Sequence, residues 1–301
     1  METKDRHPSE EGSLTRRRII EAGLAAFCSM AVPAPVSALA RTVDWASADL
    51  CRPVLRSAAY RSRRGERLAD FYRRILGGES ERTAAGSWRV SAGSETLLEI
   101  VEDRGLASSH PHAPGLFHMA FLFPNRADWL SAVHRLRESG APFFGASDHG
   151  VSHAVYSADP DGHGVELAWD KPEVEWPRSD GRVAMTTRAL DLRGELANHS
   201  PSRSGGAVRL GHVHLQTDSL GDQTDYRQSL GLAITQDTYP GALFLARGRY
   251  HHHLALNVWR VRPGLVRNPN AEGLFRLEWD LPGSPAAWED RHGLEFVNQA
   301  S

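Results

Sequence analysis

Cysteine is scarce in this chain: it has two, Cys28 and Cys51, in 301 residues. Two cysteines cannot supply a disulfide framework or a cysteine-rich zinc site. The formal net charge of −2 lacks the basic excess that a nucleic-acid-binding surface needs. What remains is ordinary globular composition, with room for about two domains. Histidine, by contrast, is abundant, and the fifteen histidines direct attention to metal chemistry.

Residues 1–40 are expected to be an export signal. Three arginines at 16–18 precede a mostly apolar stretch over 22–36, and small residues stand at the −3 and −1 positions of a cleavage site ending at Ala40. Paired arginines before an apolar stretch are typical of the twin-arginine route. Two prolines make the stretch too short and too broken to span a membrane. Cleavage after Ala40 would deliver a periplasmic or extracellular protein with Cys51 as its remaining cysteine.

The rest of the chain repeats itself. The stretches 72–77, 115–118 and 163–167 recur in the same order at 226–231, 273–276 and 292–296. A repeat of this kind predicts a tandem duplication. We expect an N-terminal domain over 41–194, a Gly/Ser/Pro-containing linker over 195–206 and a shortened C-terminal domain over 207–301.

Each copy holds two smaller units. In one of them, residues 118–123 alternate like a strand, residues 126–139 show helical spacing, and residues 151–156 and 165–169 form a hairpin around Asp159-Pro160-Asp161-Gly162. Residues 210–217 begin a similar unit, whose helix ends at Gly231. The unit reads βαβββ. The chain is therefore predicted to be α+β, with four such units and the last one truncated.

Several motifs together carry a resemblance. They are Gly115-Leu116-Phe117-His118, Gly145-Ala146-Ser147-Asp148-His149-Gly150-Val151-Ser152, Tyr156-Ser157-Ala158-Asp159-Pro160-Asp161-Gly162, Gly211-His212-Val213-His214-Leu215 and Tyr250-His251-His252-His253. Over about residues 54–281 the sequence resembles the vicinal oxygen chelate superfamily, which includes glyoxalase I and the extradiol dioxygenases. It is most similar to the two-domain catechol-2,3-dioxygenase-like branch. The resemblance implies two cup-shaped mixed sheets, one in each domain.

The resemblance also implies a metal ion, Fe(II) or else Mn(II) or another divalent ion, held by two histidines and one carboxylate. His118 and Glu166 occupy two of these ligand positions in the N-terminal cup. Strand alternation puts His118 and Glu166 on the cup side of their strands. The remaining histidine would fall at Ser57 or Ala58, but no histidine occurs from 41 to 109.

Two residues are candidates to replace that ligand. Glu99 matches a last-strand corner that carries glutamate in glyoxalase I. A hairpin that turns at Asp159–Gly162 would pair residue 153 with residue 168, so His153 is expected to line the same cup as Glu166. A polar cup that holds no metal remains the third possibility.

The C-terminal cup is expected to be structural. His212 and Glu295 occupy its ligand positions, but Arg276 stands where the repeat has His118, and an arginine cannot serve as a ligand. Arg276 is expected to pair with Glu295. His149 and His153 are the candidates for catalytic work, His149 in proton transfer and His153 in addition to its candidacy as a ligand. His251 or His253 is a candidate for orienting a substrate.

The predicted function is a metal-dependent extradiol-type dioxygenase acting on a catechol-like aromatic diol. One alternative is a non-catalytic protein of the same fold that sequesters a small molecule without metal. Another is a glyoxalase-like isomerase or lyase with Glu99, His118 and Glu166 around a divalent ion. The expected partner is a small aromatic or diol ligand, neither nucleic acid nor a membrane span is expected after signal cleavage, and association with further copies stays open.

Overall fold

The computed structural model describes residues 55–197, 199–201 and 208–300. The expected export signal, its cleavage site, both cysteines and much of the expected linker over 195–206 lie outside the described residues. Within the described residues, no helix is both long enough and apolar enough to cross a membrane.

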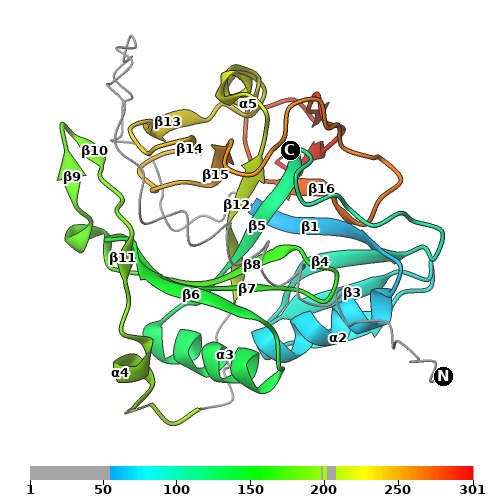
Figure 1. Ribbon diagram of the computed structural model, residues 1–301, viewed down its shortest axis with the longest axis horizontal. Coiled ribbons are helices and arrows are strands. Elements are labelled where there is room, and N and C mark those ends of the chain that lie inside the picture. Colours follow the sequence, from blue (N-terminus) through cyan, green and yellow to red (C-terminus); the bar gives the residue numbers. More distant parts are fainter. Residues whose placement is uncertain (1–54, 198, 202–207, 301) are drawn as a thin grey trace, which may run out of the picture.

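The βαβββ unit predicted from the sequence is confirmed three times, and the fourth unit keeps strands alone (Figure 1). The first unit comprises β1 (Leu55–Ser62), α2 (Gly65–Leu76), β2 (Glu79–Arg82), β3 (Trp88–Ala92) and β4 (Glu95–Glu102). The second comprises β5 (Gly115–Leu122), α3 (Arg126–Glu138), β6 (Phe143–Asp148), β7 (Ser152–Ala158) and β8 (Gly164–Asp170). The third comprises β12 (Arg209–Gln216), α5 (Gln223–Leu230), β13 (Ala233–Gln236), β14 (Ala242–Ala246) and β15 (Leu254–Asn257).

The fourth unit comprises β16 (Gly273–Trp279), β17 (Ala287–Glu289) and β18 (Glu295–Asn298). Between the second and third units lie β9 (Arg178–Ser179), β10 (Arg182–Val183), β11 (Arg188–Ala189) and α4 (Leu192–Ala197), with a 3-10 turn at Glu173–Glu175. A second 3-10 turn, Leu220–Asp222, lies inside the third unit between β12 and α5. The truncation predicted for the last unit is confirmed, because no helix follows β16 in the described chain.

The units share sheets differently from the expectation. The second and third units form one nine-stranded sheet, ordered β11-β6-β7-β8-β5-β12-β15-β14-β13, and the first and fourth form a seven-stranded sheet, ordered β17-β18-β16-β1-β4-β3-β2. β5 pairs antiparallel with β12, and β1 pairs antiparallel with β16. Each sheet therefore joins one unit from either half of the chain. The expectation of a cup within each half is wrong, because local periodicity defines a unit without saying which unit lies beside it.

Helix ends follow the sequence signals. α3 begins after Asn125, whose side chain accepts a hydrogen bond from the Asp128 backbone N–H at 2.9 Å. α2 ends at Gly77, which has φ 71° and donates its backbone N–H to the last carbonyls of the helix. Both helices turn an apolar face to the sheets, and Trp129 of α3 and Tyr72 of α2 are fully buried there.

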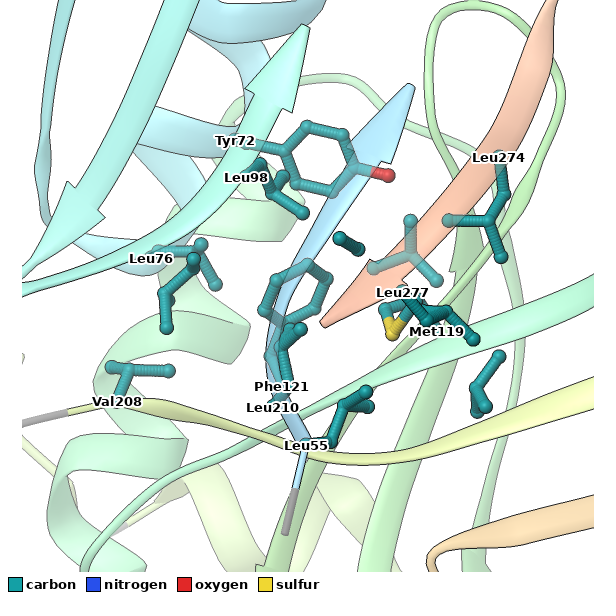
Figure 2. Close-up of a cluster of buried hydrophobic side chains, with 14 of the residues drawn as sticks. Leu55, Tyr72, Leu76, Leu98, Met119, Phe121, Val208, Leu210, Leu274 and Leu277 are labelled. Carbon is teal, nitrogen blue, oxygen red and sulfur yellow. The ribbon is translucent and has the colours of Figure 1, made fainter. Parts of the chain in front are cut away.

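The main hydrophobic core lies where the two sheets meet (Figure 2). Met119 and Phe121 of β5 pack there with Leu277 of β16 and Leu98 of β4. A smaller apolar cluster on the other face of the nine-stranded sheet contains Leu122. The two faces of β5 are thus separated by alternation, as the sequence predicts, and residues between Met119 and Phe121 point away from the main core.

Two buried tyrosines fasten the helices to acidic turns. The Tyr72 hydroxyl of α2 donates to Asp159 at 2.9 Å, and the Tyr226 hydroxyl of α5 donates to Asp290 at 2.6 Å. In both cases the helix of one unit holds the last turn of the following unit. The repeated contact is a structural consequence of the duplication, and each buried carboxylate receives the partners that its burial requires.

Candidate metal centre

Three buried side chains converge on the concave face of the nine-stranded sheet. His118 lies on β5, Glu166 on β8 and His212 on β12. One carboxylate oxygen of Glu166 lies 3.0 Å from Nε2 of His118 and 3.2 Å from Nε2 of His212. The three candidate ligand atoms all lie within 4.8 Å of one another. Two histidines and one carboxylate of this kind are the ligand set that the sequence predicts, with His212 as the member that the sequence assigned to the other domain.

The strand register explains the convergence. Ala120 of β5 is the register partner of Glu166 on one side and of His212 on the other. Side chains in register on neighbouring strands share a face. Because the residue between them is alanine, the imidazole and the carboxylate can approach each other over its methyl group. Register shifts on either side of this row show that β5 and β12 are not regularly paired.

The donor set fits a divalent metal ion. Nε2 of His118 is buried and makes no hydrogen bond of acceptable geometry, although it lies 3.0 Å from the carboxylate. Ligands at right angles around an ion, each about 2.1 Å from it, stand about 3 Å apart. The observed spacings match that value. Two imidazoles and one carboxylate on one side of an ion leave its other positions open, the pattern of non-haem Fe(II) sites.

Electrostatics prepare the three side chains for a cation. Burial by itself would raise the pKa of the Glu166 carboxyl, but the neighbouring His212 and His118 imidazoles hold it well below its usual value. Burial lowers the pKa of His118 despite the carboxylate beside it. Near neutral pH, the cluster therefore presents an ionised carboxylate and a neutral imidazole at His118, which are the protonation states that metal ligation requires.

The cluster opens into a cavity of about 810 Å³. A volume of this size suits a small organic ligand. The wall combines the three cluster residues with aromatic side chains, among them Phe117, Tyr156 and Trp259. A bound aromatic molecule could therefore contact rings and the cluster together.

His149 and Tyr156 form a hydrogen-bonded pair beside the cluster. Nε2 of His149 lies 2.6 Å from the Tyr156 hydroxyl, and Nδ1 lies 2.9 Å from the backbone carbonyl of Thr186. Because a carbonyl only accepts, Nδ1 carries the proton and Nε2 accepts from Tyr156. Burial lowers the pKa of His149. The expected proton-transfer role of His149 therefore has a neutral imidazole hydrogen-bonded beside the cluster, and the role stays a prediction.

His252 is the member of the histidine triplet that lines the cavity. Its ring lies 4.0 Å from the His212 ring, centroid to centroid. Nδ1 of His252 is 2.8 Å from Nδ1 of His251, whose Nε2 is 3.1 Å from a carboxylate oxygen of Asp170. His251 and His253 both pack against Tyr250. The sequence favoured His251 or His253 for contact with a substrate, whereas the structure brings His252 to the cavity.

His153 does not line the cavity, and the expectation that it would is wrong. Tyr156 is the register partner of Glu166, and His153 is that of Trp169. The hairpin closes at Asp159 and His163 around three residues, with Gly162 at φ 91°. The sequence predicted that residue 153 pairs with residue 168, whereas the observed partner is residue 169. A shift of one residue in strand register moves every side chain to the other face. His153 accordingly packs against Trp129 of α3, with ring centroids 5.9 Å apart.

Glu99 also lies away from the cluster. It is on β4 of the seven-stranded sheet, where its carboxylate accepts from Arg276 at 2.9 Å. Arg276 is the register partner of Glu295, but its guanidinium contacts Glu99 and lies 3.7 Å from Glu278. The expected Arg276–Glu295 pair is therefore replaced by Arg276–Glu99. The seven-stranded sheet therefore has the positive charge of Arg276 at the position where the nine-stranded sheet has His118. His212 belongs to the nine-stranded sheet.

Sequence reasoning missed Tyr156 and His252. A three-residue loop ending in glycine would have placed Tyr156 opposite Glu166, because Pro160-Asp161-Gly162 is compatible with a type I turn followed by a left-handed glycine. For His252 the strand alternation assumed for the triplet does not hold, since residues 251–253 precede β15 and lie outside any strand. No local signal marks which of the three rings faces the cavity.

Comparison with known proteins agrees with this architecture. A family model described as Glyoxalase/Bleomycin resistance protein/Dioxygenase superfamily matches residues 55–167. A catechol-2,3-dioxygenase from Bacillus subtilis (strain 168) is 35% identical over 226 residues, which cover 72% of this chain and 79% of the relative. A biphenyl-2,3-diol 1,2-dioxygenase 3 from Rhodococcus globerulus is 39% identical over 66 residues, covering 22% of this chain and 35% of that protein.

Solved structures share the fold at low sequence identity. Glyoxalase I from Zea mays has a TM-score of 0.50 and 15% identity, covering 82% of this chain and 92% of that chain. The cppA protein from Streptococcus pneumoniae TIGR4 has a TM-score of 0.53 and 9% identity, covering 83% of this chain and 100% of that chain. Repeated βαβββ units, curled mixed sheets and a catechol-2,3-dioxygenase relative along most of the sequence lead to one conclusion: the chain belongs to the glyoxalase/bleomycin resistance protein/dioxygenase superfamily.

Proposed function

We propose that this protein is a metal-dependent extradiol-type dioxygenase that opens an aromatic ring bearing two adjacent hydroxyl groups. The observation that carries the proposal is the convergence of His118, Glu166 and His212 at the wall of the cavity. The similarity to a catechol-2,3-dioxygenase of Bacillus subtilis supports the substrate class.

His118, Glu166 and His212 would hold Fe(II), with Mn(II) as the alternative. Such an ion supplies the redox-active centre that a diol needs to react with dioxygen, which the redox-inert zinc ion does not provide. The three residues carry one formal negative charge when both imidazoles are neutral. The site would therefore attract a divalent cation. The loaded site would keep a net positive charge, which attracts a diol anion.

The neighbouring side chains would remove and return protons. His149 accepts from the Tyr156 hydroxyl, so a proton from a diol hydroxyl can pass through Tyr156 to Nε2 of His149. His252 offers a second acceptor. Because His251 donates from Nε2 to Asp170, its Nδ1 accepts from His252, and Nε2 of His252 is then without a proton. Burial lowers the pKa of His252 and keeps this ring neutral.

The proposal is tested by loading the purified protein with Fe(II) under anaerobic conditions. We expect one iron per chain and, on addition of 4-methylcatechol and air, consumption of one O₂ per diol with formation of a ring-cleaved product. The Zn(II)-loaded protein is the control and is expected to consume no oxygen. Metal analysis, an oxygen electrode and mass spectrometry of the product measure these quantities.

Two other outcomes would identify the alternatives. A protein that remains metal-free after reconstitution, yet gains thermal stability from a small aromatic ligand, would be a binding protein. Turnover of a hemithioacetal with zinc or nickel and without oxygen uptake would indicate a glyoxalase-like isomerase. Either result would replace the dioxygenase proposal.

Tyr156→Phe is expected to lower kcat for the diol by about 100-fold, within the range that general acid–base groups contribute. The substitution removes only the hydroxyl that is hydrogen-bonded to Nε2 of His149. The iron content should stay at the wild-type value, because Tyr156 is outside the ligand cluster. An unchanged kcat in a fully loaded variant would exclude the proton path through Tyr156.

A further inference from the structure

Arg260 is a cavity residue whose charge the protein leaves uncompensated. Its guanidinium lies over the Phe117 ring, 4.4 Å from the centroid. Its Nε is buried without a hydrogen-bond partner in the described chain, and no carboxylate of the described residues forms an ion pair with it. Burial alone lowers the pKa of Arg260. A partly buried cation with a buried unpaired donor is costly unless a ligand completes it.

The acids of the cavity wall are already in use. Four carboxylates line the cavity, and each has another partner: Glu166 with His118 and His212, Asp159 with Tyr72 and His163, Asp161 with Ser62 and Arg64, and Glu272 with Arg63. None of the four is in contact with Arg260. A second cavity arginine, Arg267, donates to the backbone carbonyls of Leu274 and His292 and forms no ion pair with the described residues. Both arginines therefore carry positive charges that no carboxylate of the described residues pairs with.

Arg260 is held in place at the cavity. The imidazole of His112 bonds to the Arg260 backbone carbonyl at 2.8 Å, and the His112 carbonyl accepts from the Arg262 backbone N–H at 3.0 Å. The guanidinium carbon lies over the Phe117 ring, and among the described residues the guanidinium N–H groups have no hydrogen-bond partner. A planar guanidinium with free N–H groups is suited to bidentate recognition of a carboxylate.

The position of Arg260 relates it to the metal centre. Phe117 is the residue before His118, and the two rings are 5.4 Å apart, centroid to centroid. A single ring therefore separates the guanidinium from the imidazole that would hold the metal. A molecule that reaches both must carry an anionic group a short way from the end that meets the cluster.

We propose that Arg260 binds a carboxylate substituent of the substrate, so that the substrate is an anionic aromatic vicinal diol and not an unsubstituted catechol. This inference rests on the proposed function for the diol part. The carboxylate would lie against the edge of the stacked guanidinium. The two hydroxyls would then be directed to His118, Glu166 and His212.

Binding to the metal-free protein tests the subsite without reference to turnover. The probes are 3,4-dihydroxyphenylacetate, which carries a carboxylate, and 4-ethylcatechol, a neutral diol of similar size. We expect isothermal titration calorimetry to give the wild-type protein at least about a tenfold lower Kd for the anionic diol, in line with a charge-assisted bidentate contact. Arg260→Gln should bring the two Kd values to within about twofold of each other.

Two variants control for folding and for general charge. Arg262→Gln removes an exposed arginine of the same segment and should keep the wild-type preference. Arg260→Lys keeps the charge and the aliphatic stem, so it should retain part of the preference even where Arg260→Gln folds poorly. Equal binding of the two diols by the wild type, or a preference that survives in Arg260→Gln, would overturn the proposal.

The subsite and the proposed function fail separately. If the anionic diol binds through Arg260 and the iron-loaded protein consumes no oxygen with it, the dioxygenase proposal fails and the carboxylate subsite stands. If the iron-loaded protein cleaves the neutral and the anionic diol with the same kcat/KM and binds them equally, the dioxygenase stands and the subsite proposal is overturned.

Discussion

His212→Ala is expected to weaken Fe(II) binding by about 100-fold or more. His212 supplies one of three converging ligand atoms, and its Nε2 lies 3.2 Å from the Glu166 carboxylate. Loss of a partner outside the ligand set already costs 10- to 100-fold in other metal sites, so loss of a ligand should cost at least as much. Competition with a chelator of known affinity measures the effect on the metal-loaded protein, and oxygen uptake should disappear together with the iron.

His153→Ala and Glu295→Gln are the matched controls. Both residues occupy positions that the sequence offered as ligands, and both lie outside the cluster. His153 packs against two tryptophans, while Glu295 belongs to the seven-stranded sheet. Each control should retain one iron per chain with wild-type affinity. Equal loss of iron in His212→Ala and His153→Ala, or loss confined to His153→Ala, would contradict the assignment of His212.

Asp159→Ala is expected to lower the free energy of unfolding by about 3–5 kcal/mol, the usual cost of breaking a buried charged network. The Asp159 carboxylate accepts from the Tyr72 hydroxyl at 2.9 Å and from the backbone N–H groups of Asp161 and His163 at 2.9 and 3.0 Å. It also lies 3.3 Å from Nδ1 of His163. Alanine leaves these buried donors unpaired. Urea unfolding of the metal-free protein measures the change.

The control is Asp103→Ala. Asp103 is exposed, and its carboxylate accepts one hydrogen bond, from the Gly105 backbone N–H at 2.8 Å. Its removal should cost about 1 kcal/mol or less, as for most surface positions. A similar loss in both variants would mean that the Asp159 network contributes no more to stability than an ordinary surface turn.

The contribution of Asp159 should also depend on pH. Burial opposes ionisation of Asp159, yet His163 and the donated hydrogen bonds hold the pKa of its carboxyl below the usual value. This contribution is complete above about pH 3.9 and is lost as pH falls through the lower folded value. Burial likewise opposes protonation of His163, but the Asp159 carboxylate raises its pKa, so that contribution is complete below about pH 6.5 and is lost as pH rises through the higher folded value. The stability difference between wild type and Asp159→Ala should be largest between about pH 4 and pH 6.5.

Helix ends and strand faces could be predicted from the sequence because the spacing of apolar residues within a short segment determines them. Helical spacing and a stop signal predict α3 within one residue of its observed end at Glu138. Alternation along β5 places His118 and Met119 on opposite faces, and the structure confirms that Met119 belongs to the main core. The repeat predicts the shortened last unit, which has three strands and no helix among its described residues.

A difference of one residue in strand register determined which face of β7 carries His153. The sequence contains the turn Pro160-Asp161-Gly162. It does not determine whether the residues that close the hairpin are Asp159 and His163 or a pair shifted by one residue on one strand. Hydrogen bonds from the Asp159 carboxylate to the turn select the first arrangement. Because side chains alternate with a period of two, that choice puts Tyr156 in the cavity and His153 under α3.

The sequence alone determined the βαβββ units, the faces of β5 and β8, the pairing of His118 with Glu166 within one unit and the family. Tertiary structure decided the third member of the cluster, because His212 arrives from the other half of the chain when β12 pairs with β5. Hydrophobic periodicity acts within a strand or a helix and is the same whichever unit is its neighbour. The choice of neighbour depends on long-range packing between sheets, which no short stretch of sequence contains.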